Sequence, residues 1–377
     1  MTYDAIVIGL GAMGSAAAAH VARRGASVVG LEQFHAVHAL GSSHGKSRII
    51  RQAYYEDPAY VPLVLRAYEL WRELETVTGA TLLQRTGGIM VGTAEGELVR
   101  GSLRSAREHG LEHELLDAAE LRKRFPATTP RAEEVGVFER PAGILFPEEC
   151  VRAHLLAASA AGADLRFETP VTCWQRTAGG GVRVDTAAGD TIEARSAVVC
   201  GGAWLAKLVP GLRVSLRVER NVMHWFAPRS HPELLGADRL PIFMLQRAEQ
   251  PLFYGFPNIR GQGVKAAFHH SGEYSEPHLL RREVGDAEIE TARTALSAWL
   301  PDAAGSHVDS VACMYTLTPD EHFLIGVLAD HPQVVIAGGF SGHGFKFSSV
   351  VGEIAADLAL QGSTRHRIDR FALRRFA

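Results

Sequence analysis

Hydrophobic and polar residues alternate at the start of the chain in a way that predicts a strand, a helix and a second strand. Residues 5–9, AIVIG, are apolar and β-branched, which is typical of a strand buried on both faces. An alanine-rich run follows, and Gly25 is expected to end it as a helix. Residues 27–32, SVVGLE, have the character of the next strand. The pattern predicts the first βαβ unit of an α/β sheet.

Similar α/β patterns return near 150–210 and at the C-terminal end, so the first unit is one part of a discontinuous domain. Between them lie two regions rich in strand-like runs, which we expect to form a substrate domain with the ligand at the domain interface. Residues 41–60 are expected to be a loop, because they are rich in glycine and hydroxyl groups. The predicted division is 1–83, 146–215 and 312–377 for the first domain, and 84–145 and 216–311 for the second.

Composition narrows the possible partners. The 377 residues are 46% hydrophobic and 21% charged with a net charge of −3, which supports a large core and argues against nucleic acid or an anionic membrane as partner. The four cysteines lie far apart without a CxxC pair, so neither a metal site nor a disulfide framework is expected. No apolar run is long enough to span a bilayer, and no secretory leader pattern is visible. We expect a cytoplasmic protein.

The glycines after the first strand predict a dinucleotide site. Gly9, Gly11 and Gly14 form G-x-G-x-x-G, in which the first glycine permits a tight turn and the second lets backbone approach a pyrophosphate. Gly14 lets the helix pack on the strand, with the N-terminus of the helix facing the phosphates. Glu32 follows the second strand, where a carboxylate can bind ribose hydroxyls. The acid disfavours NADP but does not separate NAD from FAD.

Four further segments carry candidate chemistry. Arg48 and Arg51 in GSSHGKSRIIR could bind a pyrophosphate or a carboxylate, or lie at the surface. Lys265, in GVKAAFHH, is costly on an apolar strand unless it is paired or functional. Lys346 lies in GGFSGHGFKFSS, a second glycine-rich turn before a helix whose N–H groups suit negative charge. Cys313, in SVACMYTLTPDEHF, would on its own be assigned to a buried strand.

Taken together, the glycine motif with Glu32, GSSHGKSRIIR, CMYTLTPDEHF and GFSGHGFKFSS resemble the monomeric sarcosine oxidase and N-methyltryptophan oxidase family of flavoproteins. The resemblance runs in order from residue 2 to the last helix. It implies an α/β FAD-binding domain of the glutathione-reductase type, which is Rossmann-like, and a mixed-sheet α+β substrate domain.

The resemblance also implies roles for single residues. Cys313 would hold FAD covalently through the flavin 8α-methyl group, and Lys265 would assist the reaction with oxygen. Arg51 and Lys346 would bind the substrate carboxylate, with Met244 and Gly342 close by. The other residues expected at the catalytic centre are Arg48 against the flavin, with Ser47 beside it, and Tyr254, His269 and Tyr315 around the substrate. The remaining expected FAD contacts are Ser42, Ser43, His44, Gly342, His343, Gly344 and Lys346.

Several positions depart from the family pattern. Lys46 replaces an acid, Gln52 a histidine and Tyr55 a glycine, and Gly326 stands where an aspartate is usual. Tyr55 could narrow an entrance or stack on an aromatic substrate. The substrate therefore stays open at this point.

The expected function is an FAD-dependent amine oxidase. It would oxidise the C–N bond of a secondary amino acid, N-methyl or cyclic, to an imine and reduce O2 to hydrogen peroxide. Two alternatives within flavin chemistry are a dehydrogenase that uses another electron acceptor, and a biosynthetic oxidase of an N–N or modified amino acid. A third alternative is a nucleotide-binding protein without catalysis. The expected partners are a small amino acid and O2, and the chain is expected to act as a monomer.

Overall fold

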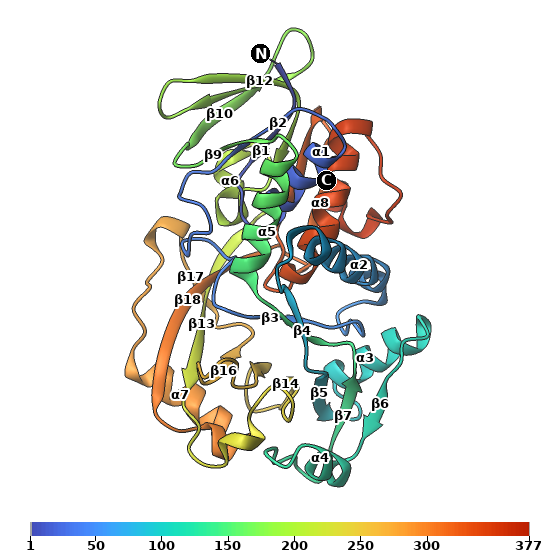
Figure 1. The fold of residues 1–377 in the computed structure, drawn as a ribbon, viewed down its shortest axis with the longest axis vertical. Coiled ribbons are helices and arrows are strands. Elements are labelled where there is room, and N and C mark those ends of the chain that lie inside the picture. The colour runs from blue at the N-terminus through green and yellow to red at the C-terminus, as the bar shows by residue number, and fades with distance from the viewer. Residues whose placement is uncertain (1, 377) are drawn as a thin grey trace.

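The computed structural model describes residues 2–376, which form two large sheets joined by a small one (Figure 1). The first sheet lies in the upper half of the view and carries both parallel and antiparallel strands. Its strands are β1 (Thr2–Ile8), β2 (Val28–Leu31), β9 (Asp164–Arg166), β10 (Val171–Arg176), β11 (Val182–Thr186), β12 (Thr191–Val199), β19 (Leu324–Leu328) and β20 (His331–Gly338).

The centre of the first sheet is parallel, with β1 between β2 and β12 and with β20 beyond β12. Four helices pack together beside it, namely α1 (Ala12–Arg23), α2 (Val61–Thr78), α5 (Pro147–Ala160) and α8 (Ser348–Gln361). Helix α1 contacts both α5 and α8, and its alanines 16–18 are fully buried. Small side chains on α1 therefore let three helices approach closely. Among residues 2–376, no helix is both long and apolar enough to cross a membrane.

The second sheet occupies the lower half of Figure 1 and is mixed, because β14 pairs parallel with β5 while its other pairs are antiparallel. Its strands are β5 (Gly88–Thr93), β6 (Glu114–Leu116), β7 (Glu134–Glu139), β13 (Arg217–Phe226), β14 (Ile242–Leu245), β15 (Phe253–Phe256), β16 (Val264–Phe268), β17 (Glu273–Tyr274) and β18 (His307–Leu317). The helices of this half are α3 (Glu97–Glu108), α4 (Ala118–Arg124) and α7 (Asp286–Ser297). The small third sheet contains β3 (Arg48–Ile50), β4 (Leu83–Arg85) and β8 (Gly143–Leu145).

This architecture confirms the fold class expected from the sequence, an α/β domain beside a mixed-sheet unit. Three local expectations differ from the structure. The 41–60 segment is not all loop, because the apolar residues of β3 pair with β8. The 84–145 region contains helices α3 and α4 as well as strands. The proposed boundary at 311/312 falls inside β18, which pairs with β13 along its length. The two-domain division itself remains a prediction.

Candidate active site

The turn between β1 and α1 is too tight for side chains at two of its glycines. Gly9 has φ +88°, and a Cβ there would lie 2.6 Å from the carbonyl oxygen of Cys200. A Cβ on Gly14 would lie 1.7 Å from the carbonyl oxygen of Gly9. Gly14 therefore serves the helix–strand contact, whereas Gly9 and Gly11 line a cavity at the N-terminus of α1. This is the geometry expected of a pyrophosphate site.

Glu32 lies at the end of β2 and is buried at the same cavity. Its carboxylate accepts hydrogen bonds from the backbone N–H groups of Leu10, at 2.8 Å, and Phe34, at 3.1 Å. These two bonds fix the side chain and leave further lone pairs free for hydroxyl groups of a ligand. The position and the chemistry both suit a ribose.

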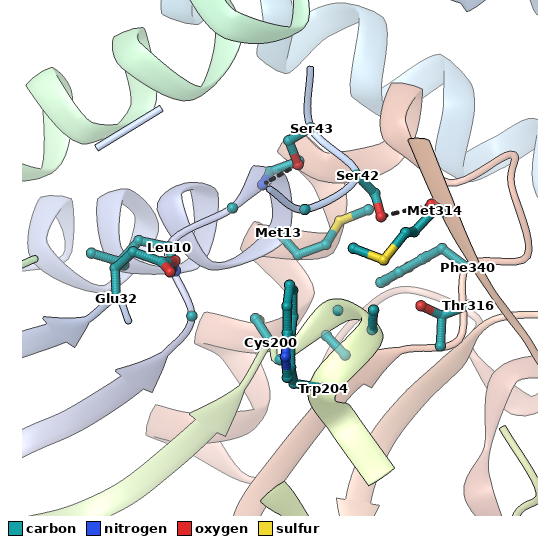
Figure 2. A pocket seen from close by; sticks show the side chains of 18 of the residues that line it. Leu10, Met13, Glu32, Ser42, Ser43, Cys200, Trp204, Met314, Thr316 and Phe340 are labelled. Atoms are coloured by element: carbon teal, nitrogen blue, oxygen red, sulfur yellow. Dashed lines mark hydrogen bonds between the residues drawn. The ribbon is translucent and has the colours of Figure 1, made fainter. Parts of the chain in front are cut away.

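The cavity at this turn, called here the long cavity, extends from Glu32 to Cys313. Figure 2 shows Glu32 at one end and Met314, Thr316 and Phe340 at the other, with Trp204 below. Two serines of the 41–51 segment lie on the opposite side. Ser43 Oγ accepts from the N–H of Ala12 at 3.0 Å, and Ser42 Oγ donates to the carbonyl of Met314 at 2.8 Å. The serines thus tie this segment to the N-terminus of α1 and to β18 of the second sheet.

Cys313 lies on β18 where the long cavity meets a second one. Its Sγ is 3.5 Å from Nη2 of Arg48. Burial alone would raise the pKa of the thiol, but a hydrogen bond from His44 and the charge of Arg48 lower it to about 6. A thiolate is the nucleophilic form of cysteine, so this side chain is activated near neutral pH.

The second cavity shares Arg48, Cys313, Tyr315, Gly342 and Phe345 with the long cavity, so the two adjoin. One face of the second sheet forms much of its wall, because alternate residues of a strand point to the same side. The residues that line only this cavity are Ile49, Arg51, Glu56, Asn221, Met223, Met244, Tyr254, Phe256, His269, His343 and Lys346.

Besides Arg48, which lines both cavities, Arg51 and Lys346 bring cationic side chains to the second cavity. Arg51 is buried and its Nη2 lies 2.6 Å from a carboxylate oxygen of Glu56. Although burial opposes its charged form, Glu56 raises the pKa of Arg51. Lys346 donates from Nζ to the carbonyl of His343 at 2.7 Å, and burial together with the charge of Arg51 lowers its pKa to about 7. The cavity therefore holds two guanidinium groups, those of Arg48 and Arg51, and one amine that titrates near neutrality.

Aromatic and imidazole groups form the rest of the second cavity's polar lining. The Tyr315 hydroxyl is 3.4 Å from Nδ1 of His269, whose ring also lies edge-on to Tyr254. Burial, reinforced by the charges of neighbouring cationic groups, holds the pKa of His269 well below its usual value. Its imidazole is therefore neutral and able to accept a hydrogen bond.

Lys265 lines neither cavity, although it is buried. Its Nζ donates to the carbonyls of Gly45 and Ser47 at 2.7 and 2.8 Å, and to Oγ of Ser47 at 3.1 Å. Burial and the charge of Arg48 lower its pKa well below the usual lysine value. The side chain holds the segment that carries Arg48.

The other predicted site residues divide between the cavities. Ser42, Ser43 and Gly344 line only the long cavity, whereas His343, Lys346 and Met244 line only the second one. His44 lines neither cavity, and it affects the site through its hydrogen bond to Cys313, which lowers the pKa of that thiol. The contacts of His343 and Lys346 thus fit a substrate site better than the cofactor contacts expected for them.

The residues that depart from the family pattern lie outside both cavities. Lys46 pairs with Asp309 at 2.9 Å, and the backbone N–H of Gln52 donates to Glu139 at 2.8 Å. Tyr55 packs in an apolar cluster with Met244 and stands 4.9 Å from the guanidinium of Arg51. Tyr55 therefore acts behind the cavity wall and contacts the lining residues from outside.

Among the lining residues that the sequence did not predict, Glu56, Trp204 and Asn221 have polar or aromatic side chains. Glu56 carries a signal, since an acid five residues after a predicted carboxylate-binding arginine can neutralise it. Trp204 follows Gly201 and Gly202 at the carboxyl end of a buried strand, where ligands of α/β sheets bind. Asn221 carries no such signal, because only the pairing of β13 with β18 places it opposite Cys313.

Comparison with known proteins gives the family. The model described as FAD dependent oxidoreductase matches residues 4–358. Monomeric sarcosine oxidase from Streptomyces avermitilis is 49% identical over 100% of this chain and 98% of that protein. N-methyl-L-tryptophan oxidase from Yersinia pestis (strain Pestoides F) is 35% identical over the full length of both chains.

A solved structure supports the same family. The open form of NikD, an unusual amino acid oxidase essential for nikkomycin biosynthesis, is 26% identical with a TM-score of 0.86, and the match covers 98% of this chain and 97% of NikD. The glycine turn, Glu32 and the long cavity fit FAD as the cofactor that the family name requires. The chain therefore belongs to the FAD-dependent oxidoreductases, in the group of flavin oxidases that includes monomeric sarcosine oxidase and N-methyl-L-tryptophan oxidase.

Proposed function

We propose that the protein is an FAD-dependent oxidase of secondary α-amino acids, with N-methyl amino acids as its first substrates. The observation that carries the proposal is the second cavity, where Arg51 and Lys346 converge beside the neutral groups His269, Tyr254 and Tyr315. Cations at one part of a cavity and uncharged acceptors at another match a molecule with a carboxylate and an amine.

The carboxylate is assigned to Arg51 and Lys346. Their side chains both lie over the ring of Tyr54, at 4.3 and 5.2 Å from its centre, so the two charges are on the same side of the cavity. In the structure, Glu56 supplies the anion that Arg51 needs. A substrate carboxylate would take over part of this role, because an arginine fork accepts a carboxylate through two hydrogen bonds.

The amine is assigned to the part of the cavity formed by His269, Tyr254 and Tyr315. Apart from Glu56, no acidic side chain of the described residues lines this cavity. A protonated amine would therefore lack a counter-ion here, whereas a neutral amine can donate its N–H to an imidazole. The site favours the uncharged amine, because only an unprotonated nitrogen has the lone pair that forms the C=N bond as hydride leaves the carbon bonded to it.

FAD is assigned to the long cavity, with its ring where the two cavities join. When bound, FAD supplies the acceptor for hydride from the substrate and passes the electrons to oxygen. Cys313 is the proposed covalent anchor, because its thiol is activated by His44 and Arg48 at this junction. Lys265, held behind Arg48, is the proposed aid to the oxygen reaction.

The named relatives support a small N-methyl substrate over a large one. The relative called sarcosine oxidase is 49% identical, and the one called N-methyl-L-tryptophan oxidase is 35% identical. Tyr55 adds bulk behind Met244 on the cavity wall, which leaves less room for an indole than a glycine would.

The test is peroxide release from the purified protein with sarcosine, N-methyl-L-alanine, N-methyl-L-tryptophan and L-proline, each at several concentrations. Glycine and L-tryptophan serve as controls without the N-methyl group. We expect peroxide with sarcosine and little with N-methyl-L-tryptophan. A yellow protein that makes no peroxide with any of the four would refute the proposal. A protein whose flavin is bleached by substrate without air, and then recovers only slowly with O2, would be a dehydrogenase.

A further inference from the structure

A buried acid and a second histidine lie directly behind the proposed amine site. Glu219 is on β13, opposite Tyr315 of β18, and is 1% exposed. Its carboxylate accepts from Nδ1 of His270 at 2.7 Å. The backbone N–H groups of Ser271 and Gly272 donate to its other oxygen at 3.0 and 2.6 Å. None of these four groups lines either cavity, so they do not contact the substrate.

His270 is surrounded by groups that favour its charged form. Its Nε2 lies 4.0 Å from a carboxylate oxygen of Glu321, so both ring nitrogens face acids. Burial disfavours the charge, but the hydrogen bond and the charge of Glu219 raise the pKa of His270. An imidazole with a carboxylate at each nitrogen is best satisfied as the imidazolium, which has two N–H donors.

His269 has the opposite surroundings. Its ring centre is 4.5 Å from that of His270, and among the described residues the only hydrogen-bond partner of the ring is the Tyr315 hydroxyl. Lys346, on the 342–346 turn, adds positive charge when it is protonated, and a proton on His343 would add more, although burial holds the pKa of His343 well below its usual value. Glu56, on the 51–60 segment, acts in the other direction and favours a charge on His269. A positive charge on His270 therefore opposes a second one on His269.

We propose that the Glu219–His270 ion pair is a positioning device that keeps His269 uncharged, so that its ring accepts a hydrogen bond from the substrate amine. The pair acts through His269 and does not touch the substrate. The inference rests on the proposed amine oxidation and names the groups that prepare the site for it. This effect on His269 depends on the positive charge of His270, and the volume of its side chain alone would not produce it.

The kinetic test compares kcat/KM for sarcosine between pH 6 and 9 in the wild type and in His270→Asn, His270→Lys and Glu219→Gln. Taking the ratio of each variant to the wild type cancels the titration of the substrate's own amine. For His270→Asn and Glu219→Gln we expect a constant ratio at alkaline pH and a progressive fall towards pH 6, because loss of the His270 charge raises the pKa of His269 and the protonated ring no longer accepts a hydrogen bond.

Two variants separate charge from structure. His270→Lys keeps a cation near Glu219 and should restore a constant ratio across the pH range. His278→Asn, at an exposed position outside the site, should match the wild type throughout. A ratio for His270→Asn that is lowered equally at every pH would mean that the pair only holds the fold, and would overturn the proposal. Glu219→Gln keeps an oxygen for the N–H groups of Ser271 and Gly272, so this variant retains the local backbone.

A second measurement does not depend on activity. Long-range ¹H–¹⁵N NMR of histidine-labelled protein, assigned with His269→Asn and His270→Asn, reports the charge of each ring. We expect His270 to be an imidazolium and His269 to be neutral at pH 7. A neutral His270 would overturn the inference even in an active oxidase. Inactivity of the wild type towards every amine tested, with the expected NMR charges, would instead refute the proposed function.

Discussion

The thiol of Cys313 differs from the other buried thiols because of its neighbours. Burial raises the pKa of Cys200 to about 12 and that of Cys150 well above the usual value. Cys313 is equally buried, yet Arg48 and His44 lower its pKa to about 6. The pKa of a buried thiol is thus decided by the hydrogen-bond donors and cations next to it.

Replacing Cys313 by serine should leave FAD bound but no longer covalent, because a hydroxyl in this site is not ionised at neutral pH. After acid precipitation, we expect the yellow colour in the supernatant for Cys313→Ser and in the pellet for the wild type. Cys173→Ser, at an exposed cysteine, is the control and should behave as the wild type. Colour in the supernatant for the wild type would contradict covalent attachment through Cys313.

The pKa of Lys346, about 7, predicts how carboxylate binding depends on pH. Below this pH the amine is protonated and assists Arg51; above it the amine is neutral, and Arg51 binds the carboxylate without this help. The dissociation constant of a carboxylate without an amine, such as propionate, should therefore rise by up to about tenfold per pH unit above pH 7. Binding is followed by the flavin absorption spectrum.

The control for this titration is Lys346→Met, which removes the titrating group and keeps the length of the side chain. Its affinity for propionate should be lower than that of the wild type at pH 6 and should not change up to pH 9. A wild-type affinity that is constant from pH 6 to 9 would exclude Lys346 as a carboxylate ligand with a lowered pKa.

Strands β13 and β18 carry site residues because their long antiparallel pairing aligns the inward-facing positions. Asn221 is opposite Cys313 and Glu219 is opposite Tyr315, all on one face of the sheet. Strand β16 continues this face, with Lys265 opposite Trp225. A register shift of one residue would move every one of these side chains to the other face. The chemistry of the site thus depends on the stability of the second sheet.

A buried ion pair in that sheet should matter for stability. Glu134, at the start of β7, lies 2.6 Å from Nε of Arg247, just after β14, and both side chains are almost fully buried. Arg247→Met leaves an unpaired buried carboxylate, so we expect the free energy of unfolding to fall by about 3–5 kcal/mol in urea titrations. The exposed pair of Arg131 and Glu249 is the matched control, and Arg131→Met should change little. Equal effects of the two substitutions would contradict this account.

The two halves of the molecule meet at the long cavity. Its lining comes from the glycine turn after β1, from the 41–51 segment, and from β18 of the second sheet (Figures 1 and 2). A ligand bound there contacts both sheets at once and is lost when either unfolds. Cofactor binding is therefore coupled to the stability of the whole chain.

Removal of FAD should weaken the protein in a way that added FAD reverses. For Cys313→Ser freed of cofactor, the thermal midpoint should rise with FAD concentration, corresponding to about 3 kcal/mol at a hundredfold excess over the dissociation constant. Covalent Cys173→Ser should not respond to added FAD, because its cofactor is already attached. A cofactor-free protein with an unchanged midpoint at all FAD concentrations would show that the two sheets do not depend on FAD for stability.

Much of the fold could be read from local patterns. The run 5–32 predicted β1, α1 and β2, because buried parallel strands and close-packed helices have distinctive sequences. Helices α3 and α4 were missed in a region read as strand-rich. Strand β3 was missed because three residues acquire strand structure only by pairing with β8, which is far away in the chain.

For the site, the sequence by itself determined the glycine turn, Glu32 and the types of residue available for chemistry, since these depend on local backbone geometry and side-chain identity. Only the tertiary structure decided how they are used. It placed Glu56 against Arg51, turned Lys265 towards the 45–47 backbone and set Glu219 behind His269 through His270. Charge states in a buried site follow from such through-space neighbours, which the order of residues along the chain does not specify.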